Sequence, residues 1–167
     1  MQDQNISDIY FMKLAIEQAR KAEQLQEIPI GAILLLDGII YSAHFNKRET
    51  EKDPLAHAEI LAIRHASGML EKWRLENATL YVTAEPCLLC SGAIYLSRIK
   101  RVVFGCSNPK GGALRFVQDN KKELGLNHQI ELCGGVLELE CAQLLRFFFR
   151  ECRSRKRELD QKINTVT

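Results

Sequence analysis

Four side chains in two short segments of the chain could together perform metal chemistry. His57 and Glu59 stand two residues apart, and Cys87 and Cys90 form a Cys-x-x-Cys pair directly after Pro86. Each pair alone is a weak signal, because Cys-x-x-Cys can be a redox pair and His-x-Glu occurs by chance in many proteins. Together the segments supply three zinc ligands, His57, Cys87 and Cys90, and a carboxylate that need not be a ligand.

The number of ligands indicates what such a zinc site would do. Structural zinc usually has four protein ligands, whereas catalytic zinc usually has three and keeps the fourth position for water. The remaining cysteines stand at no ligand spacing from a partner; they are Cys106, Cys133, Cys141 and Cys152. Zinc lowers the pKa of a bound water from about 15.7 to about 7, which yields hydroxide at neutral pH. The residues therefore predict a zinc hydrolase with a carboxylate nearby.

Two helix N-termini have to carry these side chains. Asp53-Pro54 predicts the start of a helix from Leu55 to about Ser67, because proline suits the first helical position and aspartate the cap before it. Leu88–Leu96 has helical character after the strand-breaking Pro86. The positive end of a helix favours both a thiolate and a hydroxide, so both helix starts suit the expected chemistry.

The spacing of His57 and Glu59 constrains where the metal lies. Side chains two residues apart in a regular helix point about 200° away from each other. The two can therefore share one site only if the metal lies across the first turn of the helix, with the small side chain of Ala58 facing it.

The rest of the chain alternates between helical and extended patterns, with no repeat or linker that would divide it. Asp37-Gly38 is typical of a tight hairpin turn, so we expect antiparallel strands at one end of the sheet. Strands separated by helices predict an α/β fold of three layers, α/β/α, around a mixed five-stranded sheet. The expected strands are Ile30–Leu36, Ile39–Phe45, Thr79–Thr83, Arg101–Phe104 and Gln129–Leu132. Further helices are expected from a cap at Ser7-Asp8, towards Leu124, and over about residues 136–158.

The net charge of +2 conceals a polarised chain. Residues 98–122 and 146–157 together carry thirteen basic and two acidic side chains, or +11, and the remainder carries −9. In the last helix, basic side chains recur at steps of four, three and four residues, at Arg146, Arg150, Arg153 and Arg157. On charge alone the simpler interpretation is a solvated helix face, but such a basic ridge also suits a polyanion such as RNA.

Nothing in the sequence indicates export or a membrane. The first residues are polar and acidic, where a signal peptide is basic and then apolar. The longest apolar run, Ile30–Leu36, is far shorter than the roughly 20 residues that a membrane span needs. We therefore expect a cytoplasmic protein whose thiols stay reduced and available to a metal.

The two metal segments together match the zinc deaminase signature, His-x-Glu followed by Pro-Cys-x-x-Cys. Over about residues 8 to 153 the chain resembles the bacterial tRNA-specific adenosine deaminases, which convert the wobble adenosine of an arginine tRNA to inosine. Asn127-His128 and Phe148-Phe149-Arg150 separate this family from deaminases of free cytidine. Further segments that carry the resemblance are Glu27–Ala32, Phe45-Asn46, Pro54–Glu59, Ala78–Thr83, Ser97–Ile99, Arg101–Gly105 and Leu126–His128.

The resemblance implies a single zinc-dependent deaminase domain over residues 1–167, with a cytidine deaminase-like fold and one zinc ion per subunit held by His57, Cys87 and Cys90. It implies hydrolytic deamination of adenosine 34 in the anticodon stem-loop of an arginine tRNA by zinc-activated water. Glu59 would take a proton from the water, deliver it to the purine ring and then protonate the leaving amine. The resemblance also implies a homodimer.

Contacts with the substrate follow from the same resemblance. Asn46 would hydrogen-bond the flipped base, although the position also suits an ordinary turn residue. Ile28, Pro29 and Ile30 would form an apolar wall, with Ala58 beside them. Contacts with RNA are expected at Lys110, Arg150 and Phe149, and core packing is the open alternative for Phe149.

Two departures from the family pattern lie in the loop expected near the anticodon. Asn108 stands where the family more often has an acidic residue, and Leu114–Phe116 is bulkier than the usual run. Two other functions remain open: a deaminase of a free base or nucleoside, of guanine or cytosine type, and a non-catalytic zinc-stabilised RNA-binding module. The basic surface argues against the first, since a small neutral substrate needs none. Glu59 argues against the second, because a buried carboxylate that binds no metal is costly.

Overall fold

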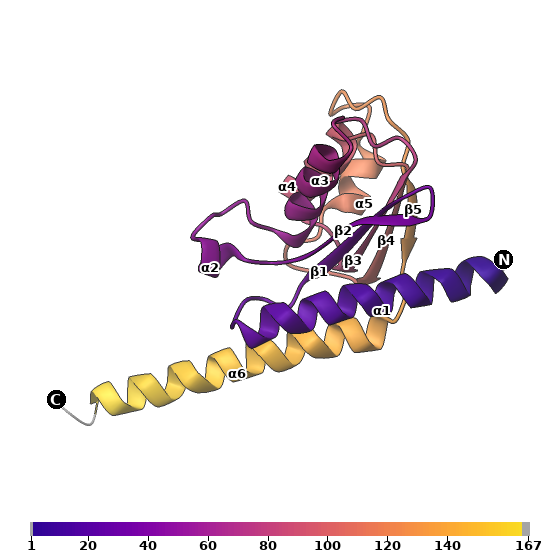
Figure 1. Ribbon diagram of the computed structural model, residues 1–167. Coiled ribbons are helices and arrows are strands. Elements are labelled where there is room, and N and C mark those ends of the chain that lie inside the picture. The colour runs from indigo at the N-terminus through magenta and orange to yellow at the C-terminus, as the bar shows by residue number, and fades with distance from the viewer. Residues whose placement is uncertain (1, 165–167) are drawn as a thin grey trace.

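A mixed five-stranded sheet forms the centre of the computed structural model, which describes the backbone of residues 2–164 and the side chains of residues 6–158, 160 and 161 (Figure 1). The strands are β1 Gly31–Leu36, β2 Ile39–Phe45, β3 Ala78–Ala84, β4 Arg101–Cys106 and β5 Glu131–Gly134. They lie in the order β2-β1-β3-β4-β5. β1 pairs antiparallel with β2 and with β3, whereas β3, β4 and β5 run parallel, so the predicted antiparallel end is confirmed.

Helices cover both faces of this sheet. They are α1 Gln2–Gln24, α2 Arg48–Glu51, α3 Ala58–Met69, α4 Leu88–Leu96, α5 Leu114–Asp119 and α6 Glu138–Asn164. α1 and α6 lie side by side on one face, and α3, α4 and α5 cover the other, which confirms the three-layer α/β/α prediction (Figure 1). None of the described helices combines the length and the apolar character that crossing a membrane requires.

Alternation along β1 explains the two cores. Ile33 and Leu35 point to the side of α1 and α6, whereas Leu34 and Leu36 belong to the core beneath α3 and α4. All six residues of β1 are buried, as expected for a strand covered on both faces.

Close packing between α1 and β1 requires the glycine at position 31. A Cβ atom there would lie 2.1 Å from the carbonyl oxygen of Ala15 and 2.5 Å from the backbone nitrogen of Ala19. α1 therefore lies directly against the backbone at the start of β1. This packing fixes the path of residues 25–30, which connect the helix to the strand.

Helix α3 begins at Ala58, three residues later than the predicted start at Leu55. His57 is its N-cap residue and has an extended backbone, with a ψ of 147°. The carboxylate of Asp53 accepts a hydrogen bond from the backbone N–H of Leu55 at 2.8 Å, so it closes a separate turn before the helix. The prediction that Asp53-Pro54 starts this helix is therefore wrong.

The other helix predictions also need correction. α1 begins at Gln2, so Ser7-Asp8 lies within the helix and does not cap it. α6 runs from Glu138 to Asn164 rather than over 136–158, and it starts late because Leu137 has a left-handed φ of 53°. Between residues 106 and 128 the helix is α5, not a segment near Leu124. The short α2 was not expected.

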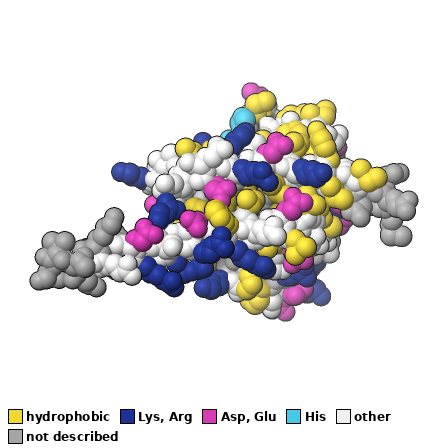
Figure 2. All heavy atoms as spheres, turned by 90° about the horizontal axis from the view of Figure 1, so that it is seen from below, with side chains coloured by type: hydrophobic (Ala, Val, Ile, Leu, Met, Phe, Trp, Pro, Cys, Tyr) yellow, Lys and Arg dark blue, Asp and Glu magenta, His cyan; other side chains and the backbone are white. Residues whose placement is uncertain are grey.

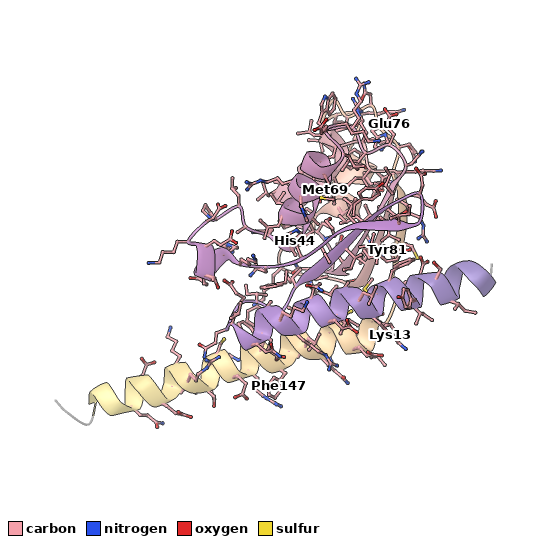
Figure 3. All side chains as sticks on the ribbon, viewed as in Figure 1. Lys13, His44, Met69, Glu76, Tyr81 and Phe147 are labelled. Atoms are coloured by element: carbon pink, nitrogen blue, oxygen red, sulfur yellow. The ribbon has the colours of Figure 1, made fainter. Side chains whose placement is uncertain are left out.

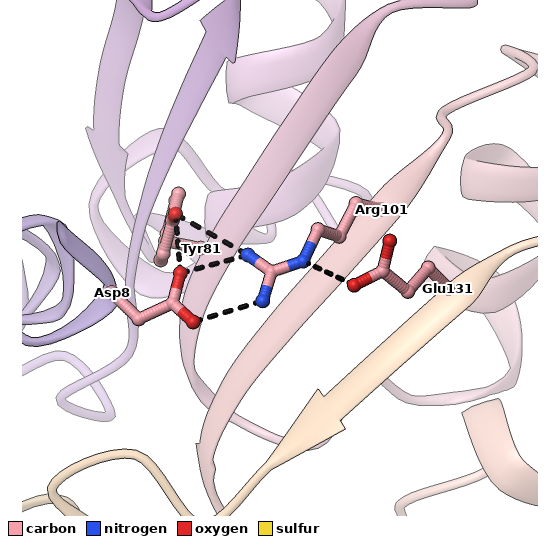
Figure 4. Close-up of polar contacts among 4 residues, drawn as sticks. All are labelled: Asp8, Tyr81, Arg101 and Glu131. Atoms are coloured by element: carbon pink, nitrogen blue, oxygen red, sulfur yellow. Dashed lines mark hydrogen bonds and ion pairs between the residues drawn. The ribbon is translucent and has the colours of Figure 1, made fainter. Parts of the chain in front are cut away.

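Asp8 is buried within α1 and ties the helix to the sheet (Figure 4). Arg101 on β4 donates to both oxygens of Asp8, from Nη1 at 2.7 Å and from Nη2 at 2.8 Å. The Tyr81 hydroxyl donates to Asp8 at 2.7 Å, and Arg101 Nε donates to Glu131 at 2.8 Å. Burial opposes the charge on Asp8, but the hydrogen bonds from Arg101 and Tyr81 outweigh it and lower the pKa of the Asp8 carboxyl.

Candidate active site

Three metal-binding side chains converge where α3 and α4 begin. His57 is the N-cap residue of α3, Cys87 is the N-cap residue of α4, and Cys90 lies buried in the first turn of α4. His57 Nδ1 lies 3.6 Å from the sulfur of Cys87 and 3.4 Å from that of Cys90, and the three donor atoms lie within 4.8 Å of one another. Tetrahedral zinc with ordinary bond lengths separates a sulfur and a nitrogen ligand by about 3.6 Å. The site therefore fits zinc, as the sequence predicts.

The surroundings of Cys87 favour the thiolate form of its side chain. Hydrogen bonds with Cys90 and with His57 lower the pKa of the Cys87 thiol to about 4. The hydrogen bond with Cys87 raises the pKa of His57, and the hydrogen bond with Cys87 together with burial raises the pKa of Cys90. Cys87 is therefore the thiol that its surroundings prepare for ionisation. Zinc binds cysteine as the thiolate, so its binding releases the protons that the two thiols still hold.

Glu59 is the second residue of α3 and only 4% of its surface is exposed. Burial raises the pKa of its carboxyl, because the charged form loses its hydration. A buried carboxyl beside a metal site is placed to accept a proton and to return it. Glu59 is thus a buried carboxyl beside the three-ligand group and is not one of its members.

A cavity of about 50 Å³ opens beside His57 and Glu59. Its wall includes four residues that the resemblance assigns to substrate, and one residue, Arg48 of α2, that sequence reasoning missed. The lining residues are Ile28, Ile30, Asn46, Arg48, His57, Ala58 and Glu59. Pro29 is buried but does not line the cavity. Nothing in the polar sequence around Arg48 signalled its position, since α2 has no buried residue to give it an apolar pattern.

The loop after β4 is fastened beside Cys87. Gly112 forms a β-bridge with Cys87, and the N–H of Ala113 donates to the carbonyl oxygen of Pro86 at 2.9 Å. Asn108 stabilises the loop, because its Oδ1 accepts a hydrogen bond from the N–H of Gly111 at 3.1 Å. An aspartate has the same acceptor at this position, so the departure from the family pattern keeps the turn.

The other departure, Leu114–Phe116, divides between core and surface. Leu114 is fully buried in the core beneath α4, whereas the Phe116 side chain is 61% exposed. The guanidinium of Arg115 lies 5.3 Å from the centre of the Phe104 ring. The larger side chains of this segment therefore pack into the core or lie on the surface. None of them lines the cavity beside His57 and Glu59.

The expected RNA-contact residues lie on the surface and do not line the cavity. Lys110 is exposed in the loop after β4. Arg150 on α6 is exposed and its guanidinium lies 5.1 Å from the ring centre of Phe147, which Figure 3 labels. Phe149 is 42% exposed and meets the Phe148 ring edge to face, so it is only partly a core residue. Arg146, Arg153 and Arg157 are exposed as well.

The basic side chains of α6 form a surface ridge. Figure 2 shows Lys and Arg side chains gathered over this helix towards its C-terminal end. The ridge is defined as Arg146, Arg150, Arg153 and Arg157. Among the described side chains it makes one ion pair, between Arg150 and the neighbouring Glu151 at 3.9 Å. Most of its positive charge therefore faces solvent.

Comparison with known proteins decides the family. The family model of the cytidine and deoxycytidylate deaminase zinc-binding region matches residues 5–106, which include all three metal-binding side chains and Glu59. The chain belongs to this deaminase family.

The deaminase is 50% identical over 150 residues to the tRNA-specific adenosine deaminase of Bacillus subtilis (strain 168), which covers 90% of this chain and 93% of that one. A solved structure from a study of A-to-I editing by tRNA:A34 deaminases at the wobble position of transfer RNA is 40% identical, with a TM-score of 0.77. That match covers 81% of this chain and 99% of the other. The guanine deaminase of Bacillus subtilis is 34% identical, with a TM-score of 0.56, and covers 70% of this chain and 69% of that one.

Proposed function

We propose that this deaminase converts adenosine 34, in the anticodon stem-loop of an arginine tRNA, to inosine by hydrolysis. The observation that carries the proposal is the zinc-binding group next to the buried Glu59, in a chain 50% identical to a tRNA-specific adenosine deaminase. We further propose that residues 1–167 form one deaminase domain and that the protein works in the cytoplasm, where its thiols stay reduced.

Zinc held by His57, Cys87 and Cys90 would activate the water that attacks C6 of the purine. Glu59 accepts a proton as the water attacks and delivers it to the purine ring. Glu59 then takes the second proton from the hydroxyl now bonded to C6 and passes it to the amine, so that the C–N bond breaks, the C6–O bond becomes a carbonyl and ammonia leaves. The burial of Glu59 beside His57 suits this role, since it keeps the carboxyl next to the reacting atoms and away from bulk water.

The cavity supports binding of a base that is turned out of an RNA loop. Ile28 and Ile30 provide an apolar wall for a flat ring, and Asn46 provides a polar group for its edge. We include Pro29 as support of this wall and Ala58 as the small side chain that leaves room beside His57. The volume of about 50 Å³ is small compared with the roughly 300 Å³ of a usual small-ligand pocket. It therefore favours the reacting edge of a flipped base, with the rest of the nucleotide held outside.

Holding the RNA falls to side chains outside the cavity in this proposal. Lys110 in the loop beside Cys87 and Arg150 in the ridge are exposed cations suited to phosphate, and Phe149 offers a partly exposed ring for a nucleotide. A homodimer is supported by three exposed leucines on α4, the helix that carries Cys90. Leu88, Leu89 and Leu96 are 63%, 41% and 69% exposed. An apolar surface of this kind is typical of an interface between protein chains.

A deaminase of free guanine is the second candidate, because the guanine deaminase of Bacillus subtilis is 34% identical to the matched part of this chain. One experiment separates the two. The zinc-loaded protein is incubated in parallel with an arginine tRNA, free adenosine, free cytidine and free guanine, and the products are measured by chromatography. We expect inosine in the tRNA and no turnover of the free compounds. Conversion of free guanine with unchanged tRNA would favour the second candidate.

A further inference from the structure

Glu27 is fully buried beside the cavity without lining it. Its carboxylate accepts two hydrogen bonds, one from Asn46 Nδ2 at 3.0 Å and one from the backbone N–H of Thr50 at 2.6 Å. Within the described part of the chain, no Lys, Arg or His forms an ion pair with it. A carboxylate buried without a cation is costly unless its hydrogen bonds are satisfied. Both of its partners lie in one short segment next to the site.

The end of α1 holds Glu27 rigidly in place. Gln26 has a left-handed φ of 60° and its N–H donates to the carbonyl oxygen of Glu23 at 2.9 Å. The N–H of Glu27 donates to the carbonyl oxygen of Ala22 at 3.0 Å. These two bonds form a Schellman motif, which closes the helix and directs the next residue inward. The carboxylate therefore approaches residues 46–50 from a fixed backbone.

The carboxylate of Glu27 determines which way the Asn46 amide faces. A carboxylate can only accept, so the NH₂ group of the amide must point to Glu27 and the carbonyl oxygen must turn away from it. The backbone of Asn46 is fixed separately, because its N–H donates to the carbonyl oxygen of Ile30 at 2.9 Å. We propose that Glu27 is a positioning residue that sets the hydrogen-bonding polarity of Asn46 towards the base. This inference rests on the proposed role of Asn46 in binding the base.

The same carboxylate also restrains α2. Thr50 is the third residue of that helix, where the N–H has no partner within the helix, and no side chain of the Lys47 N-cap supplies one. Glu27 satisfies this N–H and thereby fixes the helix whose first residue, Arg48, lines the cavity. Glu27 therefore has two routes of action, through Asn46 and through α2, and an experiment has to separate them.

Glu27→Gln separates the two routes. The new amide can still accept from Thr50 with its oxygen, but it then presents an NH₂ group to Asn46 and favours the opposite orientation of that amide. We expect kcat/KM for deamination of the anticodon stem-loop to fall by about tenfold to a hundredfold, because a hydrogen bond to the base is lost or reversed. Zinc content and the Kd for the stem-loop should stay within about twofold, since the ligands and the RNA surface are untouched.

A double-mutant cycle with Asn46→Ala then identifies the route. If Glu27 acts through Asn46, Asn46→Ala alone lowers kcat/KM, and adding Glu27→Gln to it has no further effect. If the two losses multiply, or if either single variant keeps full kcat/KM, the inference is overturned. Failure of the wild-type protein to deaminate tRNA would instead overturn the proposed function.

Two controls make the result specific. Asp8→Asn removes another buried carboxylate, far along the chain from the site, and should keep kcat/KM although it lowers stability. If Glu27→Gln prevents folding, the cycle is repeated with Glu27→Asp, which keeps an acceptor-only group but shortens its reach. A loss with Glu27→Asp that persists at full size in the Asn46→Ala background would overturn the inference in the same way.

Discussion

Asp8→Asn tests how α1 is held against the sheet. The substitution keeps the shape of the side chain but removes the charge that Arg101 contacts with two hydrogen bonds. Removing one partner of a buried ion pair costs about 3–5 kcal/mol in free energy of unfolding. Arg101 is 18% exposed and keeps its contact with Glu131, so we expect the lower end, about 3 kcal/mol. For a chain of this size that lowers Tm by about 6–12 °C.

The effect should also depend on pH. The pKa of Asp8 is lowered in the folded protein, so its charge stabilises the fold above the ordinary pKa of 3.8. That stabilisation is lost as pH falls from 3.8 through the lowered pKa. The Tm difference between wild type and Asp8→Asn should therefore be constant near neutral pH and should shrink on strong acidification.

Thermal unfolding followed by circular dichroism at several pH values measures this difference. Glu131→Gln is the matched control, because it removes the other carboxylate that contacts Arg101. The Glu131 side chain is 61% exposed. A pair this exposed contributes less than about 1 kcal/mol, so its Tm should hardly change. Equal losses in the two variants, or a Tm difference for Asp8→Asn that does not vary with pH, would refute the reasoning.

Three further predictions concern the site and the RNA surface. Glu59→Gln should keep zinc and tRNA binding but lower kcat by a factor of about 10²–10⁴, which is the usual contribution of a proton-transferring group. Inosine formation measures kcat, and zinc analysis of the same sample checks that the metal is retained. Chelation should remove about one zinc ion per chain, since the site has a single set of three protein ligands, and it should abolish inosine formation and lower Tm. Added zinc should restore the zinc content, the activity and the Tm. An active metal-free protein would contradict this prediction. Replacing Arg150, Arg153 and Arg157 by alanine should weaken tRNA binding and reduce the slope of log affinity against log salt by about 2–3, whereas replacing Lys13, Lys21 and Lys72, which lie outside the ridge, should leave the slope unchanged.

Local patterns in the sequence were sufficient for most of the sheet. The predicted bounds of β2 and α4 agree with the structure, because each is an uninterrupted pattern between strong turn or breaker residues. The turn at Asp37-Gly38 has left-handed φ values of 50° and 80°, as a tight hairpin requires. These elements depend on residues close in sequence, so the sequence alone was enough to place them.

Helix starts were predicted less well because they depend on distant partners. Asp8 is a good capping residue by type, but its partner is Arg101, 93 positions away, and that ion pair places it inside α1. Asp53 is equally suited to a helix start, yet it closes a turn with Leu55. Residue type alone does not distinguish a cap from a buried ion pair or a separate turn.

The site residues likewise divide into those that local sequence identifies and those that depend on distant parts of the chain. Spacing was enough to find His57, Cys87 and Cys90, because zinc binding demands particular residue types at short spacings. The role of Glu59 as proton carrier stays a prediction. Glu27 and Arg48 were missed as site residues, although Glu27 lies in a segment that carries the family resemblance. Their position beside the cavity arises from the end of α1 and from α2, which no apolar pattern signals.

Some family segments have a structural explanation. His128 Nε2 lies 2.7 Å from the carbonyl oxygen of Ile99, and Arg98 Nη1 donates to Asn127 Oδ1. Asn127-His128 is therefore held against the turn before β4. The ring of His128 also meets that of Tyr95. These contacts join the segment to α4, the helix that carries Tyr95 and Cys90, whereas the roles of Lys110 and the ridge in RNA binding remain predictions.

Sequencing of the tRNA after reaction tests the central claim most directly. The zinc-loaded protein is incubated with an arginine tRNA that carries adenosine at position 34, and the tRNA is reverse transcribed and sequenced, so that inosine reads as guanosine. We predict conversion at position 34 alone, with no conversion by the chelated protein or by Glu59→Gln in the same time. Unchanged adenosine at position 34 with the zinc-loaded protein, or equal conversion after chelation, would contradict the account.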